Sequence, residues 1–240
     1  MPVKDQVQAL LFDVFGTVVD WRSSIIKELS TWGAERGLTL DWAGFTDNWR
    51  ALYQPSMEEV RSGRRPWTIL DVLHRESLEK LLVQYRVSGL TEAEREHINR
   101  VWHRLSPWPD VLEGLRRLKT RYIIGTLSNG NVALLTRMAK YAGLPWDVIL
   151  GAETARAYKP LPAAYTWNAE LLGLRPSEVM LVAAHNDDLA AAAAQGLRTA
   201  FVARPAEFGR HQKKDLRADR AWDVVTDSFT GLADAVDCPP

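Results

Sequence analysis

The chain has 240 residues, 46% of them hydrophobic, so it is long enough for one large domain or for a core domain with a smaller companion. Lysine plus arginine equals aspartate plus glutamate at 30 each, which argues against nucleic acid as a partner. A single cysteine, Cys238, excludes a disulfide framework or a multi-thiolate metal site within one chain. Without a secretory signal or a run of about 18 apolar residues, we expect a soluble cytoplasmic protein with no membrane partner.

The apolar run that ends in Asp13 is typical of a strand buried on both faces of a parallel sheet. Because ligands bind at the carboxyl ends of such strands, Asp13 is expected in an active site. Gly16 permits a sharp turn, and Thr17 can orient Asp13 or a bound anion through its hydroxyl and amide. The alternative is that Asp13 is a turn residue or a helix cap.

The next stretch of chain shows helical spacing. Apolar side chains such as Ile25 and Leu29 predict a helix over residues 23–36, and residues 42–104 continue with helical patterns and no convincing strand. Pro107 then marks the end of this stretch, since proline cannot continue a helix interior. These residues therefore predict an all-helical insert.

From residue 111 onward, strand and helix patterns alternate, which predicts a parallel α/β sheet. The expected helices cover 111–119, 131–141, 162–172 and 189–195, and the expected strands cover 122–127, 148–150, 179–184, 199–202 and 224–225. A solvated loop is expected over 210–220. The predicted layout is a sheet domain of residues 1–20 and 106–240, interrupted by a helical cap domain of residues 21–105.

Polar residues follow three further strands of the predicted sheet. Ser128 and Asn129 lie where a strand meets a helix start, an arrangement that suits an anion. Lys159 precedes a proline just before a helix, and the polar run from His185 to Asp188 follows an apolar strand. Taken singly, each stretch has a structural explanation: helix capping for the residues around Ser128 and His185, and simple exposure to solvent for Lys159.

Together and in this order, these stretches resemble the haloacid dehalogenase superfamily over nearly the whole chain. The resemblance implies a doubly wound parallel sheet of the Rossmann type, with a helical cap between its first and second strands. It also implies an aspartate nucleophile in the opening motif. Asp13, Ser128, Lys159 and Asp188 occupy the matching positions.

Two positions separate the branches of this superfamily. Phosphatase members carry a second aspartate two residues after the nucleophile, where this chain has Phe15, and an aromatic ring cannot transfer a proton. Ala184 stands where the first acidic residue of their Mg²⁺ site is expected, so no metal is predicted. The L-2-haloacid dehalogenase branch has an aromatic residue at the first position and works without a metal or another cofactor. Arg50 and Tyr165 are further matches to it.

The resemblance implies that ionised Asp13 attacks the α-carbon of a short 2-halocarboxylate, giving an ester and halide, and that water then hydrolyses the ester. Lys159 and Ser128 would offset the negative charges of Asp13 and the substrate. Arg50 would receive the departing halide from the cap side. The expected partners are therefore the substrate, water and halide, and the resemblance allows a homodimer.

The fourth motif departs from the dehalogenase pattern, because its serines are absent and His185 replaces an asparagine. His185 can help to position or activate the hydrolytic water, or it can be a structural partner of Asp188. Phe15, Asn129 and Trp67 are predicted to contact the substrate, since aromatic walls suit a halogen. The alternatives to dehalogenation are a Mg²⁺-dependent phosphatase of the same fold and a non-catalytic binding protein that retains the fold.

Overall fold

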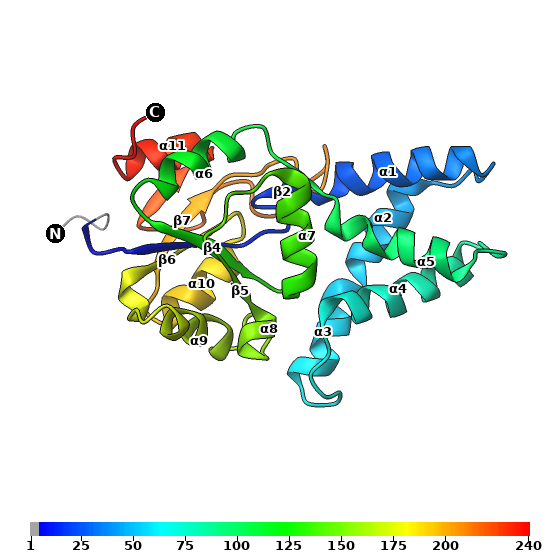
Figure 1. The fold of residues 1–240 in the computed structure, drawn as a ribbon, viewed down its shortest axis with the longest axis horizontal. Coiled ribbons are helices and arrows are strands. Elements are labelled where there is room, and N and C mark those ends of the chain that lie inside the picture. Colours follow the sequence, from blue (N-terminus) through cyan, green and yellow to red (C-terminus); the bar gives the residue numbers. More distant parts are fainter. Residues whose placement is uncertain (1–4) are drawn as a thin grey trace.

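The computed structural model describes residues 5–240 and contains a six-stranded parallel sheet (Figure 1). Its strand order is β5-β4-β1-β6-β7-β8. The strands are β1 (Ala9–Phe12), β4 (Ile123–Ser128), β5 (Val148–Gly151), β6 (Val179–Ala183), β7 (Arg198–Val202) and β8 (Val224–Thr226). Numbered along the chain, this order is 3-2-1-4-5-6, the doubly wound arrangement. The predicted fold class is confirmed.

Side chains of the central strand β1 alternate between the two faces of the sheet, as strand geometry requires. Leu10 and Phe12 enter one core cluster, Ala9 and Leu11 enter the other, and all four are fully buried. Helices cover both faces (Figure 1). They are α6 (Val111–Lys119), α7 (Val132–Ala142) and α11 (Phe229–Ala235) on the first face, and α9 (Ala163–Leu171) and α10 (Asn186–Ala194) on the second. The short helices α8 (Ala152–Ala155) and η3 (Pro176–Glu178) precede α9 and β6.

The helical insert lies beyond the carboxyl edge of the sheet (Figure 1). It consists of α1 (Trp21–Glu35), α2 (Trp42–Ala51), α3 (Tyr53–Arg61), α4 (Leu70–Gln84), α5 (Glu92–Asn99) and η2 (Arg100–His103). A two-stranded antiparallel pair, β2 (Val19–Asp20) and β3 (Ser106–Pro107), joins its two ends. The division into a core of 1–20 and 106–240 and a cap of 21–105 stays a prediction. Among residues 5–240, no helix is long and apolar enough to cross a membrane.

An aromatic cluster joins the cap to the loop after β1. The ring of Phe15 meets Trp102 edge-on at 5.8 Å and Tyr53 at 6.4 Å between centroids. Trp102 in turn stacks on His74 at 4.3 Å and packs against Trp49 at 5.6 Å. Because Phe15 lies two residues after Asp13, this cluster fixes the cap over the carboxyl edge of the sheet.

Candidate active site

Asp13 and His185 lie on the two neighbouring strands where the strand order reverses, the place where open α/β sheets bind ligands. Asp13 directly follows β1, and His185 follows β6 after one intervening residue. The Thr17 hydroxyl donates to Asp13 Oδ2 at 2.8 Å and accepts from the backbone N–H of Ala184 at 2.9 Å. Since that acceptor role fixes the hydroxyl, its proton is directed at Asp13.

Lys159 connects Asp13 to Asp188. Its ammonium Nζ lies 3.3 Å from Asp13 Oδ1 and 2.6 Å from Asp188 Oδ2. The Tyr165 hydroxyl donates to the other oxygen of Asp188 at 2.8 Å. The Asn129 side-chain oxygen accepts from the backbone N–H of Lys159 at 2.9 Å, which fixes the loop that carries the lysine. Residues of four separate motifs are thus brought together.

The pKa values of the two carboxyl groups beside Lys159, Asp13 and Asp188, are shifted in opposite directions. Burial acts to raise the pKa of Asp13, but Lys159, and then His185 and Thr17, outweigh it and hold that pKa below its usual value. Burial, aided by the charge of Asp13, raises the pKa of Asp188 despite the contact with Lys159. Such a separation equips one carboxylate to act as a nucleophile and the other to accept a proton.

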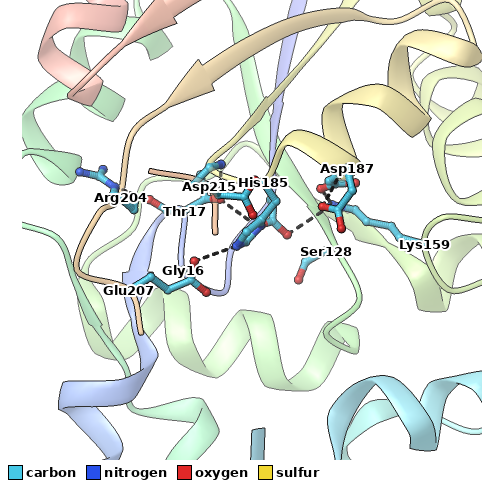
Figure 2. Close-up of polar contacts among 12 residues, drawn as sticks. Gly16, Thr17, Ser128, Lys159, His185, Asp187, Arg204, Glu207 and Asp215 are labelled. Carbon is cyan, nitrogen blue, oxygen red and sulfur yellow. Dashed lines mark hydrogen bonds and ion pairs between the residues drawn. The ribbon is translucent and has the colours of Figure 1, made fainter. Parts of the chain in front are cut away.

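His185 lies between two carboxylates, with Glu207 and Lys159 on opposite sides of it (Figure 2). Its Nδ1 is 3.1 Å from Asp13 Oδ2, and its Nε2 is 2.8 Å from Glu207 Oε2. Burial acts to lower the pKa of His185, but Glu207 and Asp13 outweigh burial and raise the pKa well above its ordinary value. Glu207 is 1% exposed and accepts a hydrogen bond from the indole N–H of Trp21 at 3.0 Å.

A cavity of about 800 Å³ opens between this cluster and the cap. The guanidinium of Arg50 packs over the rings of Tyr53, at 4.1 Å, and Trp21, at 5.2 Å, on the cap side of it. Among the described residues, Arg50 Nη1 is buried and finds no hydrogen-bond partner. Of the predicted site residues, the cavity wall includes Asp13, Phe15, Arg50, Asn129, Lys159, Tyr165, His185 and Asp188.

Three predicted site residues lie elsewhere. Thr17 is fully buried behind Asp13, and Ser128 is fully buried with its hydroxyl accepting from the Gly130 N–H at 3.1 Å. Trp67 is absent from the cavity wall and packs on the ring of Tyr158 at 4.8 Å, so its contact with the substrate stays a prediction that the cavity does not support. Within residues 5–240, no three His, Cys, Asp or Glu side chains are grouped so as to hold a metal ion.

A family model described as a haloacid dehalogenase-like hydrolase matches residues 7–196. The chain belongs to the haloacid dehalogenase-like hydrolases. The solved structure of a defluorinating L-2-haloacid dehalogenase is 49% identical, with a TM-score of 0.94 over 96% of this chain and 95% of that one. A second L-2-haloacid dehalogenase structure is 48% identical, with a TM-score of 0.94 over 97% of this chain and 100% of that one.

A curated relative, (S)-2-haloacid dehalogenase 4A of Burkholderia cepacia, is 27% identical over 95% of this chain and 99% of its own. The (S)-2-haloacid dehalogenase 1 of Pseudomonas sp. (strain CBS-3) is 26% identical over 88% and 94% of the two chains. The family that the four motifs predicted is therefore confirmed.

In this haloacid dehalogenase-like hydrolase, two site residues carried no sequence signal. Glu207 lies in the loop after β7, outside every recognised motif, and reaches the site only through the fold. Tyr53 belongs to a cap helix whose apolar spacing does not show which side chain faces the sheet. Lys214 and Asp215, from the predicted solvated loop, also line the cavity. That loop therefore covers one side of the site.

Proposed function

We propose that this hydrolase converts short 2-halocarboxylic acids into 2-hydroxy acids through an ester on Asp13, without a metal. One observation carries the proposal: a buried carboxylate with a lowered pKa faces the cavity beside the ammonium of Lys159, opposite the unpartnered guanidinium nitrogen of Arg50. The names of the 49% and 48% identical structures, both L-2-haloacid dehalogenases, support it.

In the first step, Asp13 Oδ1 attacks the α-carbon of the substrate. Oδ2 is already engaged by Thr17 and His185, whereas Oδ1 has its contact with Lys159 at 3.3 Å and is the freer nucleophile. The new bond joins Oδ1 to the α-carbon, and the carbon–halogen bond breaks with its electron pair on the halide. Arg50 offers positive charge to that halide from the cap side.

In the second step, water attacks the Asp13 carbonyl carbon and gives its proton to Asp188, whose raised pKa suits that role. The bond from the carbonyl carbon to Oδ1 breaks, and Oδ1 leaves as the hydroxyl oxygen of the product. Lys159 donates the proton that this oxygen needs. Proton transfer from Asp188 to Lys159 across 2.6 Å restores the starting state.

A Mg²⁺-dependent phosphatase is less well supported. Hexitol phosphatase A of Escherichia coli (strain K12) is 26% identical over 87% of this chain, so the fold alone does not decide between the reactions. Two residues favour dehalogenation. The ring of Phe15 packs against Trp102 at the position where a phosphatase carries its second aspartate, and Ala184 supplies no oxygen ligand for Mg²⁺.

The test is halide release from a panel of 2-haloacids with and without EDTA, run beside a Mg²⁺-dependent phosphatase assay. Fluoroacetate belongs in the panel because a 49% identical structure is that of a defluorinating enzyme. We expect halide release that EDTA leaves unchanged and that Asp13→Asn abolishes. Turnover that is lost in EDTA and restored by Mg²⁺ contradicts the proposal.

The covalent step has its own test. A single turnover in ¹⁸O-labelled water with excess enzyme is expected to place the label in the Asp13 carboxylate, because water attacks the ester carbonyl. Mass spectrometry of the peptide that contains Asp13 measures this. Label found in the hydroxy acid alone means that water attacks the substrate directly.

We also propose a cytoplasmic location and a homodimer. The single cysteine, Cys238, is free and buried, which suits a reducing compartment. Sedimentation velocity of the purified chain checks the dimer, and a monomer at all concentrations contradicts it.

A further inference from the structure

Both ring nitrogens of His185 face carboxylate oxygens, Asp13 Oδ2 at 3.1 Å and Glu207 Oε2 at 2.8 Å. An ionised carboxylate accepts hydrogen bonds and donates none. The Nε2 contact with Glu207 is a hydrogen bond, and Nδ1 lies at ion-pair distance from Asp13, so both contacts favour a ring that carries a hydrogen on each nitrogen and a positive charge. The sequence raised the possibility that His185 is a base for the hydrolytic water. A doubly protonated ring in direct contact with the nucleophile has no free lone pair for that task.

We infer that the His185 cation, held in place by Glu207, donates a hydrogen bond to the carbonyl oxygen of the Asp13 ester and stabilises the negative charge that develops there during hydrolysis. This role rests on the proposed function, because it requires the ester to form. His185 would be a catalytic residue that contacts the reacting atoms, and Glu207 a positioning residue.

The two oxygens of Asp13 are distinguished by their contacts, which decides where this charge appears. Oδ2 accepts a hydrogen bond from Thr17 and lies against His185 Nδ1, so attack by Oδ1 leaves Oδ2 as the ester carbonyl oxygen. Ester formation removes the charge of Asp13. Attack by water then returns a negative charge to Oδ2, which already accepts from the Thr17 hydroxyl and lies 3.1 Å from Nδ1 of the charged His185 ring. Preorganised donors of this kind stabilise a transition state because they need no reorganisation during the reaction.

Glu207 is built into the site and does not merely lie near it. Its Oε1 accepts from the indole of Trp21 at 3.0 Å, while Oε2 faces His185. The loop after β1 leaves room for it: a Cβ on Gly16 would lie 2.1 Å from Glu207 Oε1. A glycine at position 16 therefore permits the turn, where φ is +90°, and leaves space for the Glu207 carboxylate beside it (Figure 2).

Other charged groups around His185 affect its titration. Asp187, in the helix α10 that begins directly after His185, pairs with Lys214 at 2.8 Å, and Lys214 also lies 3.8 Å from Asp215. Lys159 approaches from the far side of Asp13. Lys214 offsets the nearby acidic pair, so Glu207 and Asp13 retain the proton of the ring in the free enzyme. In the ester Asp13 is neutral, and Glu207 is the carboxylate that retains it.

The pH dependence of ester hydrolysis distinguishes a cationic donor from a base. With excess enzyme and a single turnover of 2-chloropropionate, quenched-flow mass spectrometry follows the Asp13 ester as it forms and decays. A donor is lost when pH rises through the pKa of His185, so we expect the decay rate to fall at alkaline pH. A decay rate that rises through that range identifies His185 as a base and overturns the inference.

Two variants assign the alkaline fall to this pair, since Lys159 can also deprotonate. Glu207→Gln removes a charge that retains the proton on His185, so the fall is expected to move to lower pH. His185→Asn keeps an N–H donor that does not titrate, so the fall is expected to move to higher pH. Glu178→Gln is the matched control, because Glu178 lies before the amino end of β6, away from the site, and pairs with Arg175. The pH of the fall is expected to stay unchanged in this control. A fall that stays in place in both site variants overturns the inference.

His185→Leu removes the donor, and we expect ester decay to slow by about 100-fold while halide is still released in a burst. A direct measurement needs no activity. In ¹⁵N-labelled free enzyme at neutral pH, NMR is expected to show a hydrogen on both ring nitrogens of His185, and Glu207→Gln to lower the pH at which one is lost. A neutral ring overturns the inference. Absence of any halide burst from the wild-type enzyme contradicts the proposed function instead.

Discussion

Arg50 is a cap residue for whose charge the described residues supply no ion pair. Its Nη1 is buried and unpaired while its guanidinium packs over Tyr53. If it receives the halide, its charge matters most as the carbon–halogen bond breaks. Loss of one member of a buried charged pair costs about 2–5 kcal/mol, so Arg50→Ala is expected to lower kcat/KM roughly 30-fold to several thousand-fold, with a fall in kcat. Steady-state halide release measures both constants.

Arg50→Lys is the matched variant for that experiment. Lysine keeps the positive charge but loses the planar group that packs on Tyr53 and Trp21, so part of the activity is expected to return. Wild-type kcat/KM in Arg50→Ala would exclude Arg50 from the halide site.

Gly16 combines a left-handed backbone with a close approach to Glu207. Its φ is +90°, and an added Cβ would overlap the carboxylate. Gly16→Ala is expected to lower the free energy of unfolding by roughly 2–5 kcal/mol, from backbone strain and overpacking together. Gly63 has a similar φ of +75° with open space around it, so Gly63→Ala is expected to lose about 1 kcal/mol. Urea unfolding compares the two, and equal losses would contradict the close packing of Glu207 against Gly16.

The sequence predicted those site residues whose position follows from a neighbouring strand or helix. Asp13 follows an apolar strand, Lys159 precedes a helix, and Asp188 lies in the first turn of a helix that follows a strand. The structure brings all three together. Glu207 was not predictable, because the indole that holds it is 186 positions away along the chain. The sequence could not place Trp67, which lies in the loop between α3 and α4, because the spacing of an isolated aromatic residue does not tell a cavity wall from packing.

At the level of elements, cap helix α3 holds the loop that carries Lys159. The Arg61 guanidinium, at the end of α3, donates to the backbone carbonyl of Lys159 at 2.8 Å, while Glu58 accepts from it at 2.8 Å. A hydrogen bond from a charged group contributes about 1.5–3 kcal/mol. We therefore expect Arg61→Ala to lower kcat/KM roughly 10- to 150-fold by loosening Lys159, with a smaller effect on substrate affinity than on kcat.

Arg64→Ala provides the control, since Arg64 pairs with Glu59 while both side chains are more than half exposed. Exposed pairs of this kind contribute about 0–1 kcal/mol, so its kinetics are expected to stay near wild type. Equal effects of the two substitutions would mean that α3 does not position Lys159.

The regular elements of the core were predictable because each is a continuous apolar run or an amphipathic helix. The strand at 148–150 and the helix at 111–119 were found at or within one residue of their observed bounds. The pair β2 and β3 was missed, because two residues are too short for any periodicity. Helix α10 begins at Asn186, before the expected 189, because Asp187 and Asp188 favour the first turn of a helix.

At the scale of the whole molecule, the cap and the sheet share one core. A continuous cluster of buried apolar side chains runs from Phe12 on β1 through Phe15 and Trp102 to Leu73 and Leu78 on cap helix α4. The proposed cap domain thus buries much of its apolar surface against the sheet domain. Two parts that share a core in this way are expected to lose their structure together.

The chain is therefore expected to unfold in a single transition in urea. Six of the ten tryptophans lie within residues 21–105, so tryptophan fluorescence reports mainly on the cap, whereas far-ultraviolet circular dichroism reports on the whole chain. Coincident midpoints and slopes from both probes are the expected result. Trp102→Ala leaves a cavity at the seam and is expected to lower both midpoints together, by about 3–5 kcal/mol in the free energy of unfolding. A fluorescence transition at lower urea than the circular dichroism transition would contradict this, above all if Trp102→Ala widens the gap between the two midpoints. The cap would then unfold independently, so that Arg50 and Tyr53 leave the cavity while Asp13 stays in place.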